Sequence, residues 1–200
     1  MKTETIAAIA TGMSNSGIGI VRISGDQAFE VIDRIYRNKK GQAGTLWDAK
    51  SHTAHYGYIY DGEELIDEVL VMIMHAPRTF TGEDTVEIDC HGGVYAMQRV
   101  LDTVLKNGAE IAEPGEFTKR AFLNGRMDLS QAEAVMDVIE AKNEYALKSS
   151  VGKLRGSIGQ KRKDLRAKII YHIAYIESAL DDPEHISLDG YPQELEKENE

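Results

Sequence analysis

The hydrophobic pattern of this 200-residue chain changes at Pro114, and no other feature constrains its fold as strongly. Before Pro114, short runs of β-branched residues, typical of strands, alternate with segments whose apolar residues recur at helical spacing. From Gly115 to Leu180 the pattern is almost entirely helical. The sequence therefore predicts an α+β domain over residues 1–117, followed by an all-α helical region over residues 118–200.

The first region is predicted to form a mixed or antiparallel sheet with helices. Strand signals cover residues 5–11, 17–24, 52–60, 65–75 and 85–90. Asp61-Gly62 predicts a hairpin between the third and fourth of these strands, because glycine readily takes the positive φ of a tight turn. Asp26 is expected to cap a helix that runs to about Tyr36. A second helical stripe runs from Tyr95 to Asn107-Gly108.

The second region is predicted to be helical. A short helix from Gly115 to Leu123 precedes a longer pattern that reaches Leu180 and ends at Asp182-Pro183. Ser130 and Glu133 match a capping box, in which each side chain accepts a hydrogen bond from the other residue's backbone N–H. Three glycines weaken the long pattern and predict a break or a close helix contact: Gly152, Gly156 and Gly159.

The charge of the chain is unevenly distributed. A net charge of −10 excludes a uniformly basic nucleic-acid binder but not a local basic patch. Lys142–Lys168 has a local balance of +7, and Asp181–Glu200 has a local balance of −7. Segments of opposite sign are typical of solvated helix surfaces, and they also suit contacts between helices, between subunits or with RNA.

Composition also limits the location and the covalent chemistry of the chain. A single cysteine excludes an intramolecular disulfide and a multi-cysteine metal site. No apolar run is long enough for a membrane span, and no signal peptide follows Met1. We therefore expect a soluble cytoplasmic protein.

The glycine clusters do not match the nucleotide-binding motifs. Gly17-Ile-Gly19 lacks the third glycine of a dinucleotide fingerprint. Gly152-Lys153 lacks the earlier glycine and the following Ser or Thr of a phosphate-binding loop. Binding of GTP or ATP by that route is not expected from this chain.

Isolated candidates for catalysis are also weak. Cys90 and His91 are neighbours in a predicted strand, so their side chains point to opposite faces and a buried structural cysteine is favoured. The same alternation separates Asp67 from Glu68 and argues against a catalytic carboxylate pair. His52 and His55 fit an exposed sheet face at least as well as a metal site.

Three segments join regular elements to glycine-rich turns with charged side chains, which is common at binding sites: Gly19–Gly25, Phe80–Gly93 and Pro114–Ala134. Taken singly, each is equally compatible with a turn and its capping charges. Together they resemble the N-terminal part of the tRNA modification GTPase family called MnmE or TrmE, from Thr5 to about Tyr191. The loop Gly12–Gly17 departs from the Pro-Pro-Gly type sequence of many relatives.

The resemblance implies an N-terminal domain that is similar to the folate-binding domain of aminomethyltransferases. Such a domain binds 5-formyltetrahydrofolate or another tetrahydrofolate one-carbon derivative and forms a homodimer. A helical domain follows, into which the family inserts a potassium-stimulated GTPase domain. With an FAD-containing partner, MnmG (GidA), the family protein installs an aminomethyl-type group, such as carboxymethylaminomethyl, on the wobble uridine of tRNAs.

The same resemblance limits what this segment is expected to do. The sequence ends about where the GTPase insertion would begin, so GTP, K⁺ and Mg²⁺ are expected to bind only through that absent domain. No catalytic residue and no metal ligand is therefore assigned here, and no GTPase activity is expected from the segment alone.

By resemblance, the folate-contact positions are Arg22, Glu83 and Arg126. A carboxylate such as Glu83 suits the amino group and adjacent ring N–H of a pterin, and an arginine fork suits the carboxylates of the glutamate tail. Which arginine meets the tail stays open, as does the alternative that Glu83 is only a capping or loop carboxylate. His91-Gly92-Gly93 and Asn124 are further candidates for shaping the pocket.

Two other functions remain as alternatives. One is a non-catalytic dimerisation and RNA-docking module in which Lys142–Lys168 contacts phosphates. The other is a free-standing folate-dependent aminomethyltransferase, against which the segment Pro114–Ala134 argues.

Overall fold

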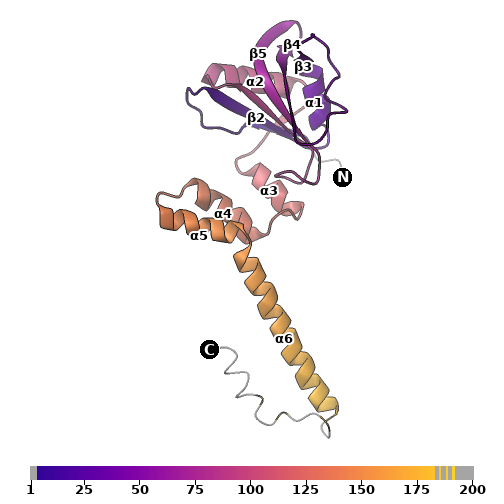
Figure 1. Ribbon diagram of the computed structural model, residues 1–200, viewed down its shortest axis with the longest axis vertical. Coiled ribbons are helices and arrows are strands. Elements are labelled where there is room, and N and C mark those ends of the chain that lie inside the picture. The colour runs from indigo at the N-terminus through magenta and orange to yellow at the C-terminus, as the bar shows by residue number, and fades with distance from the viewer. Residues whose placement is uncertain (1–3, 183–184, 186–187, 189–190, 192–200) are drawn as a thin grey trace. The chain divides into compact units, whose positions relative to one another are not determined.

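The computed structural model describes residues 4–182, 185, 188 and 191 (Figure 1). They form two compact units, which divide between Ala132 and Glu133. The division predicted at residues 117 and 118 stays a prediction. Within the described ranges, no helix combines the length and the hydropathy that crossing a membrane requires.

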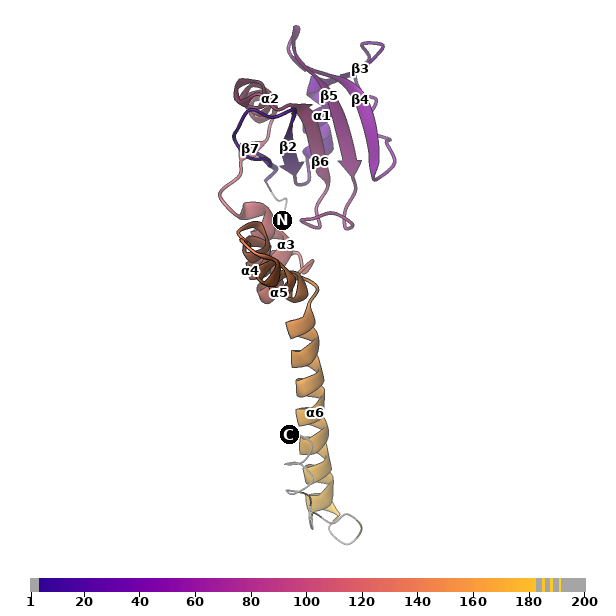
Figure 2. The ribbon, with the colours of Figure 1, turned by 60° about the vertical axis from the view of Figure 1, so that its left-hand side comes forward.

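The first unit is built on one mixed sheet, whose strands are β1 (Ile6–Ile9), β2 (Ile18–Ser24), β3 (Tyr36–Asn38), β4 (Thr53–Asp61), β5 (Glu64–Met74), β6 (Thr85–His91) and β7 (Glu110–Ile111). The strand order is β3-β4-β5-β6-β2-β1-β7, and β1–β7 is the parallel pair in an otherwise antiparallel ladder (Figure 2). Its helices are α1 (Ala28–Ile35), α2 (Val94–Lys106) and α3 (Glu116–Leu123). The predicted α+β class is confirmed.

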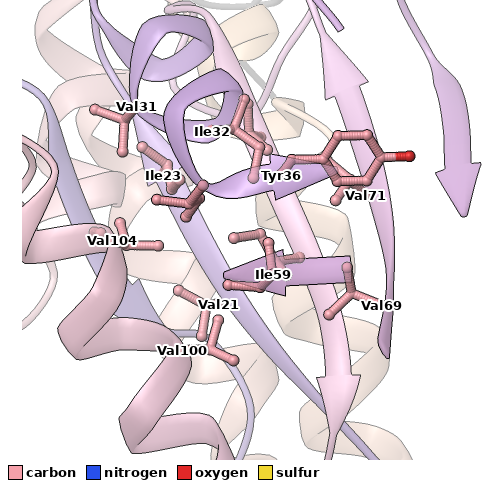
Figure 3. Close-up of a cluster of buried hydrophobic side chains, with 14 of the residues drawn as sticks. Val21, Ile23, Val31, Ile32, Tyr36, Ile59, Val69, Val71, Val100 and Val104 are labelled. Carbon is pink, nitrogen blue, oxygen red and sulfur yellow. The ribbon is translucent and has the colours of Figure 1, made fainter. Parts of the chain in front are cut away.

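The core lies between the sheet and helices α1 and α2. Alternate strand residues such as Val21 and Ile23 point to this face, where they meet Ile32 of α1 and Val100 and Val104 of α2 (Figure 3). A two-residue strand period and a helical period of 3.6 thus bury complementary stripes. The side chains of β2 and β6 on the opposite face of the sheet lie outside this core and are available to form a site.

Most predicted elements of this unit are confirmed, including the hairpin. Asp61 pairs with Glu64, and Gly62 adopts a φ of 63° in the turn. The first helix begins later than predicted, with Gln27 rather than Asp26 in the N-cap position. The backbone N–H of Gln27 donates instead to Thr5 Oγ1 at 2.9 Å, so a long-range contact takes the place of a local cap.

The helical region consists of α4 (Leu129–Ile139), which starts in the first unit, α5 (Glu144–Leu154) and α6 (Ser157–Asp181). The single long helical pattern is therefore interrupted twice. The break at Gly156, with a φ of 82°, matches the glycine prediction, whereas Gly152 lies inside α5. The break before α5 was not predicted. Asn143 Oδ1 caps the N-terminus of α5 by accepting a hydrogen bond from Ala146 N–H at 2.8 Å. The predicted end at Asp182 is confirmed; Pro183 and most of the acidic tail lie outside the described residues.

The capping box predicted at Ser130 and Glu133 is wrong by two residues. Asp128 precedes α4, and its Oδ1 accepts a hydrogen bond from Gln131 N–H at 2.9 Å. Gln131 Oε1 accepts in return from Asp128 N–H at 2.9 Å. Asp128 and Gln131 are therefore the reciprocal pair, and the Ser130 hydroxyl supports it by donating to Asp128 Oδ1 at 2.6 Å.

Candidate functional site

Strand β2, the loop before β6 and helix α3 meet around two of the predicted folate contacts. Ser24 of β2 pairs with Thr85 of β6, which places Glu83, two residues before Thr85, beside Ser24. Arg22 pairs with Glu87 in the same ladder and lies next to Phe117 of α3. The sheet register therefore brings Arg22 and Glu83 to one side of the first unit.

Glu83 is a buried carboxylate, with 8% of its surface exposed. Its Oε2 accepts a hydrogen bond from Ser24 Oγ at 2.8 Å. Arg120 Nη1 approaches both carboxylate oxygens, at 3.4 Å from Oε1 and 3.3 Å from Oε2. Buried charge is tolerated only with such partners. The long contact to Oε1 leaves that oxygen with capacity to accept from a ligand.

The loop that presents Glu83 is shaped by its own threonines. Thr79 Oγ1 donates to the carbonyl oxygen of Glu83 at 2.7 Å and accepts from Gly82 N–H at 3.0 Å. Gly82 has a φ of 80°, which favours glycine. Asn124, at the end of α3, donates from Nδ2 to Thr81 O at 2.8 Å and so ties the loop to the helix.

Arg22 is already engaged by the protein. Its Nε and Nη2 donate to Glu87 Oε1 at 2.8 and 2.7 Å. The guanidinium carbon lies 5.5 Å from the ring centroids of both Phe80 and Phe117. The guanidinium group of Arg22 is thus held in place by one carboxylate and two aromatic rings.

Arg126 follows the C-terminal turn of α3. Gly125 takes a φ of 70°, and Arg126 N–H then bonds to Ala121 O at 2.9 Å, as in a glycine-terminated helix end. The side chain of Arg126 is exposed and forms no hydrogen bond or ion pair with any described residue. It is therefore available to an anionic group.

Arg120 belongs to the same site, but sequence reasoning did not single it out. Its Nη2 and Nε donate to Glu116 Oε1 at 2.8 and 3.2 Å, and Nη1 donates to Glu4 O at 2.7 Å. Burial raises the pKa of Glu116, but the hydrogen bond from Glu113 N–H and the contacts with Arg120 outweigh burial and leave that pKa lowered. The spacing of Glu116 and Arg120, four residues apart on a helix, was the available signal.

His91, Gly92 and Gly93 lie at the far end of β6 from Glu83, roughly 20 Å along the strand by its rise per residue. His91 Nδ1 is 2.6 Å from Asp67 Oδ1, and Asp67 Oδ2 accepts from the His91 backbone N–H at 2.8 Å. The Asp67 hydrogen bond and charge raise the pKa of His91. Gly92 leaves no room for a Cβ against Ser16, and Gly93 precedes α2. These residues therefore do not share a site with Arg22 and Glu83.

A shallow hollow of about 300 Å³ lies beside His91 and is lined by Gly17, Ile18, Tyr56, Glu68, Val69, Leu70, Asp89, Cys90 and His91. Cys90 itself is buried, as predicted, and burial raises the pKa of its thiol to about 11. A protonated thiol is a poor nucleophile, so the hollow does not contain a reactive cysteine. Within the ranges that the structure describes, no three His, Cys, Asp or Glu side chains cluster as a metal site would require.

The basic stretch Lys142–Lys168 covers α5 and part of α6. Lys148 pairs with Glu144 at 2.7 Å, and Lys153 pairs with Asp137 at 3.1 Å. These pairs lower the positive charge that the stretch can offer to phosphates.

Comparison with known families covers nearly the whole chain. Residues 5–126 match the family model described as GTP-binding protein TrmE N-terminus, and residues 129–199 match the MnmE helical domain. The segment that carries Arg22, Glu83 and Arg120 lies within the first match.

Curated relatives of the chain carry the name tRNA modification GTPase MnmE. The protein from Lachnoclostridium phytofermentans is 66% identical over 98% of this chain and 42% of its own length. Those from Geobacillus thermodenitrificans and Bacillus subtilis are 49% and 48% identical, over 98% and 91% of this chain. The chain thus spans about two fifths of the length of the relatives that it matches.

Proposed function

This chain belongs to the TrmE/MnmE family of tRNA modification GTPases, and on that premise we propose that it binds a one-carbon derivative of tetrahydrofolate at Glu83, Arg22 and Arg126. The buried carboxylate of Glu83 is the observation on which the proposal depends. Among the residues that the structure describes, its Oε1 has a single long contact, at 3.4 Å from Arg120 Nη1. An ionised carboxylate in this position suits a ligand edge that offers two adjacent N–H donors, as a pterin ring does.

The two arginines have different roles in this proposal. Glu87 already occupies two donors of Arg22, so a ligand carboxylate would have to displace Glu87 to form a paired contact there. Arg126 is exposed and has no such competitor among the described residues. Arg126 therefore binds the carboxylates of the glutamate tail, while Arg22 places positive charge beside the ring. When bound, 5-formyltetrahydrofolate or a related folate supplies a one-carbon unit.

The remaining functions belong to the longer protein. We assign folate binding and homodimerisation to residues 1–117, with α3 and Arg126 of the following segment completing the site. Residues 118–200 then form the first part of a helical domain. A GTPase domain outside this chain would bind GTP, K⁺ and Mg²⁺. With the FAD-containing partner MnmG (GidA), the assembled protein would modify the wobble uridine of tRNAs in the cytoplasm.

Calorimetric titration with 5-formyltetrahydrofolate tests the site. We expect the unaltered chain to bind, and Glu83→Ala and Arg22→Ala to lose about ten-fold or more in affinity, because Glu83→Ala removes the acceptor of the ring N–H groups and Arg22→Ala removes the positive charge beside the ring. Arg99→Ala is the matched control, since Arg99 is a partly exposed arginine on α2 that pairs with Glu64. Unchanged affinity in both Glu83→Ala and Arg22→Ala would exclude this site.

A truncated ligand separates the two arginines. Arg126→Ala is expected to weaken binding of 5-formyltetrahydrofolate but not of 5-formyltetrahydropteroate, which lacks the glutamate tail. An equal loss with both ligands would place Arg126 at the ring instead of the tail.

A further inference from the structure

The carboxylate of Glu83 is held by a chain of contacts that begins at Glu113, just before α3. Glu113 N–H donates to Glu116 Oε2 at 2.8 Å, and Glu116 Oε1 accepts from Arg120 Nη2 at 2.8 Å. Arg120 Nη1 then reaches Glu83. Because α3 supplies both Glu116 and Arg120, the position of this helix fixes the cation that faces Glu83.

The hydrogen bonds that Arg120 donates differ in length. The short hydrogen bonds go to Glu116 and to the carbonyl oxygen of Glu4, at 2.8 and 2.7 Å. The contacts with Glu83 are longer, at 3.3 and 3.4 Å. The guanidinium is therefore fixed by other groups, and it neutralises Glu83 without saturating the oxygens of that carboxylate.

Burial makes this cation necessary for a charged Glu83. The Arg120 and Glu83 side chains are 11% and 8% exposed, so water contributes little to stabilising either charge. A buried carboxyl group without a cationic partner binds a proton readily and then no longer accepts two hydrogen bonds from a ligand edge.

We propose that Arg120 is a positioning residue that keeps Glu83 ionised and oriented for a ligand edge with two N–H donors. This inference rests on the proposed folate site and extends it, because it gives Arg120 a role that acts through Glu83. It also gives the segment Pro114–Ala134 a physical role, since that segment holds the cation, its anchor Glu116 and the helix that carries both.

The charged groups around Glu83 come from helix α3, the loop itself, β2 and β6. Helix α3 supplies Arg120 and Glu116, and the loop itself supplies Asp84, whose Oδ1 accepts from Ala76 N–H at 2.8 Å. Beyond Ser24, β2 supplies Arg22, which forms an ion pair with Glu87 of β6. None of these groups is a histidine, which is the side chain whose charge ordinarily changes near neutral pH.

The test is the pH dependence of 5-formyltetrahydrofolate affinity in the whole chain, from about pH 5.5 to about pH 8.5. We expect a flat profile in the unaltered chain. In Arg120→Gln, affinity should fall about ten-fold or more at the acidic end and recover as pH rises. Arg120→Lys restores the charge and should restore the flat profile, whereas Arg99→Gln should change nothing.

The outcomes distinguish this inference from the proposed function. If the unaltered chain binds folate, an Arg120→Gln profile that is unchanged, or lowered equally at every pH, would overturn the positioning role. Absence of folate binding by the unaltered chain would overturn the proposed function and the inference together. If circular dichroism shows that Arg120→Gln does not fold, Glu116→Gln loosens the same cation, and a flat profile in that variant would overturn the inference.

Discussion

Cys90, the single cysteine of the chain, is a residue whose surroundings determine its reactivity. Burial is the main reason that its pKa is raised to about 11, with a further contribution from the negative charge of Asp67. We expect iodoacetamide to alkylate the folded protein at about pH 8 about a hundred-fold more slowly than the urea-unfolded chain, because the thiolate is the reactive form. Alkylation can be followed by mass spectrometry, and equal rates in the two states would contradict the buried position.

His91 offers a second residue-level prediction, on stability. Its pKa is raised above 6.5 mainly by the hydrogen bond that its ring donates to Asp67, so the folded state binds the proton more tightly than the unfolded state. The resulting stabilisation is present below the unfolded pKa and is lost as pH rises through the folded pKa. Urea unfolding should therefore show a larger difference between the unaltered chain and Asp67→Asn at about pH 6 than at about pH 8.5.

A His91→Gln background provides the control for this effect. It preserves the hydrogen bond from the backbone N–H of residue 91 to Asp67 but removes the titrating ring. In that background, Asp67→Asn should cost the same free energy at both pH values. A pH-dependent cost there would assign the effect to another group.

Residues of the candidate site differ in how well sequence predicts them. Glu83 and Arg22 were predicted from family resemblance, and the register of β2 with β6 explains why they lie on one side. Arg120 was missed because its contact with Glu83 joins residues 37 positions apart and depends on how α3 packs. Local patterns predict which residues share a helix face, but not what that face will meet.

At the level of elements, mutations can test which residues cap the N-terminus of α4. The structure assigns this role to Asp128 and Gln131. Asp128→Ala removes the acceptor of Gln131 N–H and of the Ser130 hydroxyl, and should lower the free energy of unfolding by about 1 kcal/mol. Glu133→Ala alters the residue that sequence wrongly placed in the box, and should change stability by less than about 0.5 kcal/mol. Urea denaturation monitored by circular dichroism measures both, and a larger cost for Glu133→Ala would restore the original assignment.

Elements with strong local signals were predicted well, and those defined by distant partners were not. The hairpin at Asp61-Gly62 and the helix end at Asn124-Gly125 follow from glycine at positive φ, which is a local property. The short strands β3 and β7 form because β4 and β1 are available to pair with them. The break at residues 140–143 lacks glycine and proline, so only the capping side chain of Asn143 indicated it.

At the level of the whole molecule, apolar burial is concentrated in the first unit. The main core cluster runs from Ala7 to Ala109. By contrast, α6 exposes large apolar side chains, among them Leu165, Ile169, Ile170, Tyr171 and Ile173. Among the described side chains of α6 only Ala179 is buried, and a helix that buries so little surface is marginally stable in water, because tertiary packing supplies most helical stability. The two units should therefore differ in stability.

Two optical probes can separate the units during urea unfolding. Trp47, the single tryptophan, lies in the loop between β3 and β4 of the first unit, so its fluorescence reports on that unit, whereas circular dichroism also follows α5 and α6. We expect helical signal to be lost at lower urea concentration than the fluorescence transition. Ile73→Ala, in the core, should cost about 2–5 kcal/mol and shift the fluorescence transition. Ile169→Ala, at a half-exposed position on α6, should leave that transition within about 0.5 kcal/mol. Coincident transitions by both probes would instead mean that the chain unfolds as one cooperative structure.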